Sequence, residues 1–150
     1  MKKITPIIDD DEFAKFILSD GERSTTVTAK ISDTDTCHKV LKEIFSSETV
    51  DLQDILALND DGIVAKAVST SAYGKKCVSQ ALKKAFSYGV TNTAAILVTV
   101  SQNLRSFAEI ENFLSNEEFF TQDGGYVIWK VIREKKFPKN AICLDAIIFT

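Results

Sequence analysis

The chain has 150 residues, of which 45% are apolar, and a formal net charge of −3. This length suits one domain, and the apolar content excludes a mostly disordered chain. The small negative charge argues against a polyanion as partner, so we expect no nucleic-acid binding. The longest apolar runs, near Ala94–Val100 and Ala141–Phe149, are too short to cross a bilayer as helices, and the apolar stretch that ends at Ile8 is shorter than we expect of a signal peptide. We therefore expect a single soluble, cytoplasmic domain (1–150) without membrane contact.

The first 20 residues predict a short edge strand followed by a helix. The strand is expected at Lys3–Ile8. Asp9 and Glu12 have the spacing of a capping box, and Phe13, Phe16 and Ile17 follow at helical spacing. This pattern predicts a helix that ends at Asp20-Gly21.

The next 38 residues predict one strand and two helices. Apolar and polar residues alternate over Thr26–Ile31, which is typical of a half-buried strand. Apolar positions from Cys37 to Phe45 recur at helical spacing and predict a helix over Thr34–Phe45. A polar segment then leads into a short helix, Leu52–Leu58, which ends at a turn containing Gly62.

From Gly62 onward, strands alternate with helices until two strands close the chain. The apolar run Ala94–Val100, in which Thr99 is the one polar residue, is typical of a central strand that is covered on both faces. Alternation predicts largely parallel strands, and the short turn before Ala141 predicts an antiparallel last pair. The fold class is therefore α/β, with a small mixed, largely parallel sheet of four to five strands packed by two main helices. The predicted strands are Ile63–Val68, Ala94–Val100, Tyr126–Arg133 and Ala141–Phe149, and the two helices are Lys75–Tyr88 and Ser106–Leu114.

Several weak motifs occur in an order that resembles the C-terminal domain of the bacterial FtsZ/tubulin family. In that family a loop of pattern N-x-D-x-x-D joins the GTPase half to this domain. Asp51 and Asp54 match its acidic positions, whereas Thr49 replaces its asparagine. Further matches are Gly62-Ile63-Val64-Ala65, Gly74 with Ala81, Ala95–Val100 and Leu104–Glu109; a family arginine after Gly74 and a glycine near Ser101 or Gln102 are missing. The resemblance covers Thr49–Thr150 and leaves residues 1–48 unassigned.

The resemblance implies a role for the two acids of the loop. In the family they reach the GTP of the next subunit and help to position the attacking water. Thr49, Asp51 and Asp54 are therefore the candidate binding residues. The simpler interpretation is that Asp51 and Asp54 cap the following helix, because carboxylates are favoured at helix N-termini.

The sequence offers little chemistry of its own. It contains no G-x-x-x-x-G-K-[ST] phosphate loop, no C-x-x-C pair and no metal-ligand cluster, so we predict no catalytic residues, no cofactor and no metal. His38 is adjacent to Cys37 on a helix, where the two side chains point about 100° apart. All three cysteines, Cys37, Cys77 and Cys143, are expected to be buried thiols, and Asp145 is expected to be exposed on a strand.

Two functions remain open from the sequence. The first is a non-enzymatic assembly or regulatory module, which binds itself or an FtsZ/tubulin-like GTPase in cell division. The alternative is a small α/β enzyme or ligand-binding domain with its site at a subunit interface. The fold alone does not decide between them, because one fold hosts many functions. A pocket that gathers carboxylates with perturbed pKa values would favour the enzyme or ligand-binding domain. A flat or convex surface around Asp51 would favour the assembly module.

Overall fold

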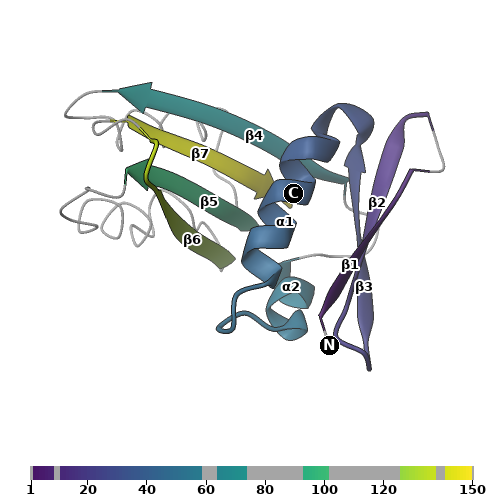
Figure 1. Cartoon of the computed structure of the whole chain (residues 1–150). Helices are drawn as coiled ribbons and strands as arrows, with labels where there is room; N and C mark the ends of the chain where they lie inside the picture. Colours follow the sequence, from purple (N-terminus) through teal and green to yellow (C-terminus); the bar gives the residue numbers. More distant parts are fainter. Residues whose placement is uncertain are drawn as a thin grey trace.

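The computed structural model describes residues 2–8, 11–58, 64–73, 93–101, 126–137 and 141–149. These residues form one curled sheet of seven strands that partly encloses a twelve-residue helix, α1 (Figure 1). In chain order the elements are β1 (Lys3–Ile7), β2 (Phe13–Ser19), β3 (Ser24–Lys30), the 3-10 turn η1 (Ile31–Asp33), α1 (Thr34–Phe45), α2 (Leu52–Leu58), β4 (Val64–Tyr73), β5 (Thr93–Ser101), β6 (Tyr126–Glu134) and β7 (Ala141–Ile148).

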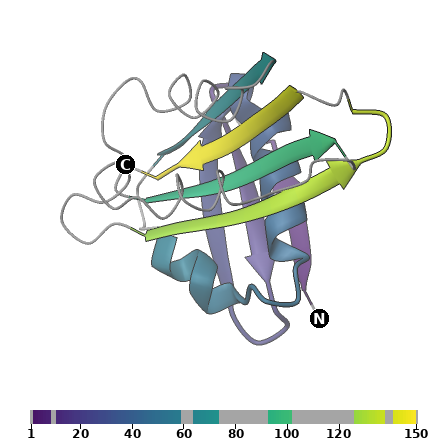
Figure 2. The same ribbon diagram turned by 90° about the vertical axis from the view of Figure 1, so that its left-hand side faces the viewer.

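The strands lie in the order β1-β2-β3-β4-β7-β5-β6, and four of these six pairings are antiparallel. The parallel pairs are β3 with β4 and β5 with β6. β3 and β4 are joined only by Thr28 opposite Val64 and Ala29 opposite Ala65. Because this joint is so short, β1–β3 turn away from the other four strands, as Figures 1 and 2 show from two sides.

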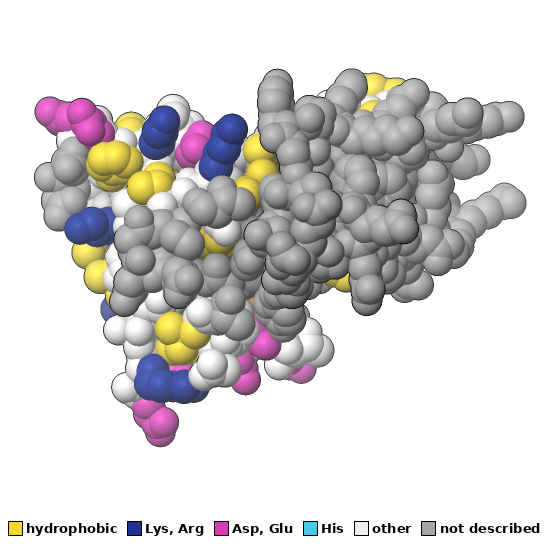
Figure 3. Space-filling model, turned by 180° about the vertical axis from the view of Figure 1, so that it is seen from behind, with side chains coloured by type: hydrophobic (Ala, Val, Ile, Leu, Met, Phe, Trp, Pro, Cys, Tyr) yellow, Lys and Arg dark blue, Asp and Glu magenta, His cyan; other side chains and the backbone are white. Residues whose placement is uncertain are grey.

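The hydrophobic core fills the inside of the curl. α1 turns Cys37, Val40, Leu41, Ile44 and Phe45 inward, and all five are at most 1% exposed. These side chains belong to one cluster with residues of β2, β3, β5 and β7, so α1 connects both parts of the sheet. Burial of the apolar face of α1, rather than helix propensity, therefore stabilises this helix. The outer surface around β1–β3 mixes hydrophobic with basic and acidic side chains (Figure 3).

The helix predicted after Asp9 is wrong, because Phe13–Ser19 is strand β2. Asp20 and Gly21, expected to end that helix, instead form the hairpin turn between β2 and β3. The Asp20 Oδ1 accepts hydrogen bonds from the N–H groups of Glu22 (2.9 Å) and Arg23 (2.7 Å), and Gly21 has a positive φ of 97°. These backbone donors, Arg23 first, hold the pKa of Asp20 below its ordinary value.

Cross-strand pairing decided the structure of this segment. Phe16 lies opposite Val27 and Leu18 opposite Thr25, and all four side chains are buried on the α1 side of the hairpin. The period-two pattern of Ala14, Phe16 and Leu18 was present in the sequence beside the helical one. Pairing with β3 and packing on α1 favour the strand.

The predicted sheet was too small, and its strands are not largely parallel. The first 30 residues contribute three strands rather than two, and β4 extends to Tyr73. β4, β5 and β6 do run in the same direction, as predicted, but the antiparallel β7 lies between β4 and β5. β6 and β7 are consequently not neighbours. The predicted helices Lys75–Tyr88 and Ser106–Leu114 lie outside the described residues.

Eight predicted elements are confirmed, with bounds that differ by a few residues in several strands: β1, β3, β4, β5, β6, β7, α1 and α2. Lys3–Ile7 is an edge strand, and the helices Thr34–Phe45 and Leu52–Leu58 have the predicted bounds. β5 is a central strand between β7 and β6, and its residues 95–100 are all buried. Within the described part of the chain, no helix is long and apolar enough to cross a membrane.

Candidate functional site

The acidic loop, Thr49–Asp54, lies at the point where the chain passes from α1 to α2. After Phe45 the chain turns through two backbone hydrogen bonds, Ser47 N–H to the Ile44 carbonyl and Val50 N–H to the Ser47 carbonyl, both 3.2 Å. Thr49 is exposed, and its hydroxyl lies 3.0 Å from that of Ser47. The loop is therefore a surface turn, as predicted.

Asp51 and Asp54 cap α2 reciprocally. The Asp54 N–H donates to Asp51 Oδ1 (3.1 Å), and the Asp51 N–H donates to Asp54 Oδ2 (2.9 Å). This is the geometry of a capping box, with a second aspartate in place of the usual glutamate. Leu52 and Ile55 are fully buried and hold α2 against the core. The capping interpretation is thus correct, and because Asp51 remains exposed, the same carboxylate also faces solvent.

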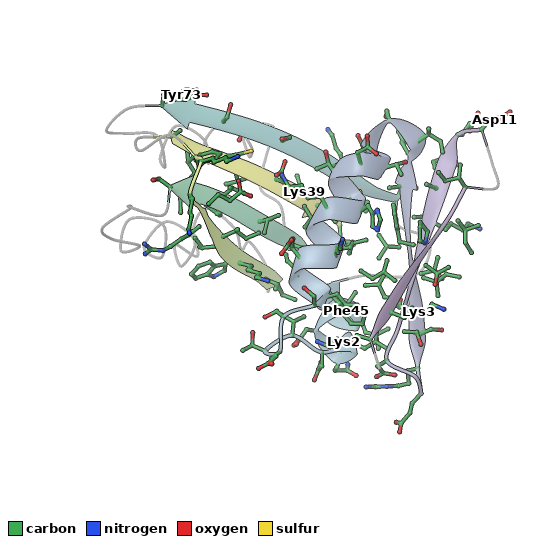
Figure 4. The ribbon with its side chains drawn as sticks, in the orientation of Figure 1. Lys2, Lys3, Asp11, Lys39, Phe45 and Tyr73 are labelled. Carbon is green, nitrogen blue, oxygen red and sulfur yellow. The ribbon has the colours of Figure 1, made fainter. Side chains whose placement is uncertain are left out.

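The first residues of the chain hold the acidic loop in place. The Lys2 ammonium donates to the carbonyl of Ser47 (2.8 Å) and to that of Val50, and lies 5.2 Å from the centre of the Phe45 ring. Figure 4 shows Lys2 beside Phe45 at the end of α1. From the β2–β3 turn, Arg23 Nη1 donates to Gln53 Oε1 (3.0 Å). Sequence reasoning assigned residues 1–48 no role, and two of them, Lys2 and Arg23, donate hydrogen bonds to the acidic loop and its surroundings.

Asp145 is a buried acid that sequence reasoning placed on the surface. It is 3% exposed, in the centre of β7. Its Oδ2 accepts a hydrogen bond from Lys39 Nζ of α1 (2.9 Å), and its Oδ1 accepts one from Ser69 Oγ of β4 (2.6 Å). The hydrogen bond to Asp145 raises the pKa of Lys39 above its ordinary value. Asp145 therefore connects α1 to β4 and β7, and each of its carboxylate oxygens accepts a hydrogen bond.

The cysteine and histidine side chains do not form a nucleophilic site. Cys37 is fully buried in the core, and burial raises the pKa of its thiol to about 12. His38 is exposed, and its ring stacks on Phe16 of β2 with 5.6 Å between ring centres. Cys143 is half-buried rather than buried, and desolvation together with the charge of Asp145 raises its pKa. Both described thiols are therefore protonated near neutral pH, and Cys77 lies outside the described residues.

The described residues contain no group of three or more His, Cys, Asp or Glu that could hold a metal ion. Three open cavities are lined by lysines, by η1 and by the ends of β1–β4. Their linings do not include Asp51, Asp54 or Asp145. Of the two loop acids, Asp51 is exposed and Asp54 is half-buried, and an exposed carboxylate is available for contact with another molecule.

By sequence, the chain matches no protein-family model and no curated protein. Its structure does match known ones. A W319Y mutant of FtsZ from M. jannaschii superposes with a TM-score of 0.62 at 16% identity, over 79% of this chain and 38% of that one. An empty FtsZ dimer of the same organism gives a TM-score of 0.63 at 17% identity, over 80% and 38%.

The fold of this chain resembles the C-terminal domain of FtsZ. CetZ from Methanosaeta thermophila also matches, with a TM-score of 0.44 at 18% identity, over 75% of this chain and 34% of that one. The chain spans little more than a third of the FtsZ chains that it matches. The match covers 79% of the 150 residues, which is more than the segment Thr49–Thr150 contains. It therefore also includes part of the first 48 residues, which the sequence resemblance had left unassigned.

Proposed function

We propose that this chain is a non-enzymatic assembly module that binds itself or a tubulin-type GTPase through the acidic loop, Thr49–Asp54. The observation that carries this proposal is the likeness to FtsZ, with TM-scores of 0.62 and 0.63 over only 38% of the FtsZ chain. One of these FtsZ structures is described as a dimer, which makes subunit association a reasonable function for a related fold.

The electrostatics of the loop support a binding role. Asp51 and Asp54 exchange backbone hydrogen bonds, so two carboxylates are held within one turn of helix. Like charges at this spacing repel one another unless solvent or a counter-charge reduces the repulsion. A basic or metal-bound surface of a partner would lower this repulsion, and the free energy gained would favour association.

The alternative, an enzyme or ligand-binding domain with a site between subunits, has less support. Such a site would gather carboxylates with perturbed pKa values in a pocket. Asp145 is the most buried carboxylate of the described residues, but Lys39 and Ser69 already pair with it, and it does not line the cavities described above. The acidic loop is therefore the better candidate for function.

The proposal is tested by capture and then by direct binding. The chain, tagged at its C-terminus, is used to capture proteins from a lysate of the source cell, and mass spectrometry identifies any tubulin-type GTPase. Sedimentation velocity then measures binding of the purified GTPase to the chain, and self-association of the chain alone. We expect a complex in at least one of these two mixtures.

The variant Asp51→Asn/Asp54→Asn separates binding from capping. Asparagine also accepts the capping hydrogen bonds, so we expect the variant to fold normally while its affinity falls about tenfold, or about 1.4 kcal/mol. Asp11→Asn/Glu22→Gln removes two exposed charges elsewhere and should leave the affinity unchanged. A lower urea midpoint with unchanged binding would mean that the acids only cap α2. Absence of any captured GTPase, together with a monomeric chain, would refute the proposal.

A further inference from the structure

A cavity of about 280 Å³ lies between the start of β1 and the last turns of α1. Its lining combines three lysines and one histidine with an apolar wall. The residues are Lys2, Lys3, Ile4, His38, Lys42, Phe45 and Ser46, and we call this the lysine cavity. Among the described residues, no acidic side chain contributes to this lining.

The three lysines of the cavity differ in what they already bind. Lys2 is engaged with the carbonyls of Ser47 and Val50. Lys3 and Lys42 are exposed, and within the described part of the chain neither ammonium has a hydrogen-bond or ion-pair partner. The nearest acid along α1, Glu43, is engaged elsewhere, because its carboxylate lies 3.6 Å from Lys130 of β6. Two positive charges at this cavity therefore have no counter-charge among the residues that the structure describes.

The carbonyls at the end of α1 would ordinarily repel an anion there, because this end of a helix dipole is negative. Here the carbonyls of Lys42 and Ile44 already accept hydrogen bonds. Ser46 N–H donates to the Lys42 carbonyl and Ser47 N–H to the Ile44 carbonyl, both at 3.2 Å, and the Lys2 ammonium covers the Ser47 carbonyl. The end of α1 thus presents positive charge to the cavity instead of free carbonyls.

We propose that the lysine cavity binds a small organic anion, a carboxylate or phosphate that carries one apolar group. The ammonium groups of Lys3 and Lys42 pair with the anionic head, since lysines bind phosphate as point charges. Ile4 and the Phe45 ring contact the apolar group. The volume is at the lower end of the range for ligand sites, which favours a single ring or short chain over a nucleotide. This inference is independent of the acidic loop.

Phenyl phosphate is the probe, and inorganic phosphate and phenol are the two compounds from which it is built. Binding is followed by the NMR shifts of the backbone amides of Ile4, His38 and Ser46 in protein with an unmodified N-terminus. We expect saturable shifts with phenyl phosphate, at least fivefold weaker binding of inorganic phosphate, and no saturation with phenol. Raising the salt from 20 to 200 mM should weaken binding, because the lysines are exposed.

The variant Lys3→Gln/Lys42→Gln tests the assignment, because it retains the Lys2 contacts. We expect its dissociation constant for phenyl phosphate to rise at least tenfold with an unchanged urea midpoint. Lys15→Gln/Lys135→Gln makes the same change of net charge outside the cavity and should alter affinity less than twofold. Equal losses in both variants, or no saturable binding by the wild type, would overturn the proposal. Equal affinities for phenyl phosphate and inorganic phosphate would overturn the role of Ile4 and Phe45.

Discussion

The buried acid of β7 makes an asymmetric prediction about stability. The Asp145 side chain is 5% exposed, whereas that of its partner Lys39 is 53% exposed. Removal of the lysine leaves the Asp145 carboxylate buried. Among the described oxygen and nitrogen donors, only the Ser69 hydroxyl then still donates a hydrogen bond to it. Removal of the acid leaves an ammonium that water can reach. We therefore expect Lys39→Met to be more destabilising than Asp145→Asn.

The size of each effect follows from burial. Loss of one partner of a fully buried pair costs about 3–5 kcal/mol, and the exposure of Lys39 reduces the expected cost of Lys39→Met to about 2–4 kcal/mol. Asp145→Asn retains an oxygen for Ser69 and should cost about 1 kcal/mol, the usual net value of a hydrogen bond. In the double variant the charge is no longer stranded, so its cost should be close to that of Asp145→Asn alone.

Urea unfolding of the three variants measures these differences. The control is Lys42→Met, which lies in α1 within one turn of Lys39 and has no ionic partner among the described residues. Its free energy of unfolding should stay within about 0.5 kcal/mol of wild type. The reasoning is refuted if the two single costs add in the double variant, or if Lys39→Met is no more destabilising than Lys42→Met. Either result would mean that the pair behaves as an ordinary surface pair.

Four further predictions follow from burial, capping and the missing phosphate loop. Leu97→Ala, in the fully buried centre of β5, should lower the free energy of unfolding by about 2–5 kcal/mol in urea melts; an unchanged midpoint would contradict its burial. Asp51→Ala should cost about 1 kcal/mol and Asp51→Asn almost nothing, and equal costs would argue against capping. Burial raises the pKa of the Cys37 thiol from its ordinary value of 9.0 to about 12, so the unfolded chain loses this proton first as the pH rises. The free energy of unfolding should therefore be constant below pH 9 and fall above it, by up to about 1.4 kcal/mol per pH unit. Cys37→Ala should show a shallower fall. Purified protein should release no phosphate from GTP above the blank, and turnover that Asp51→Ala abolishes would overturn this.

Local patterns were sufficient where a segment packs mainly through one face. α1 is amphipathic over its whole length, and its predicted bounds are those observed. The apolar run of β5, which Thr99 alone interrupts between Ala94 and Val100, predicted a central strand, because a strand covered on both faces has few polar positions. The spacing of Asp51 and Asp54 left capping open as the alternative to binding, and the reciprocal capping hydrogen bonds are present.

Tertiary pairing decided what the local pattern left ambiguous. Phe13, Phe16 and Ile17 suit a helix, whereas Ala14, Phe16 and Leu18 suit a strand, and the choice depends on β3, which lies beyond the hairpin turn. The burial of Asp145 depends on Lys39, which is 106 residues away in the chain. One signal was nevertheless present, because an acid inside the apolar run of β7 suggests a buried acid with a partner. The contacts of Lys2 with the acidic loop involve backbone carbonyls, which no sequence motif marks.

The central claim is that the acidic loop acts in the assembly of a tubulin-type GTPase, and filament formation tests it most directly. Light scattering and pelleting follow GTP-dependent assembly of the GTPase captured from the source cell, with increasing amounts of this chain. We predict that the wild type changes the assembled fraction at about equimolar ratio. Asp51→Asn/Asp54→Asn, with its helix caps retained, should have no such effect. An assembled fraction that stays constant with a tenfold excess of wild-type chain, or that both proteins change equally, would contradict the account.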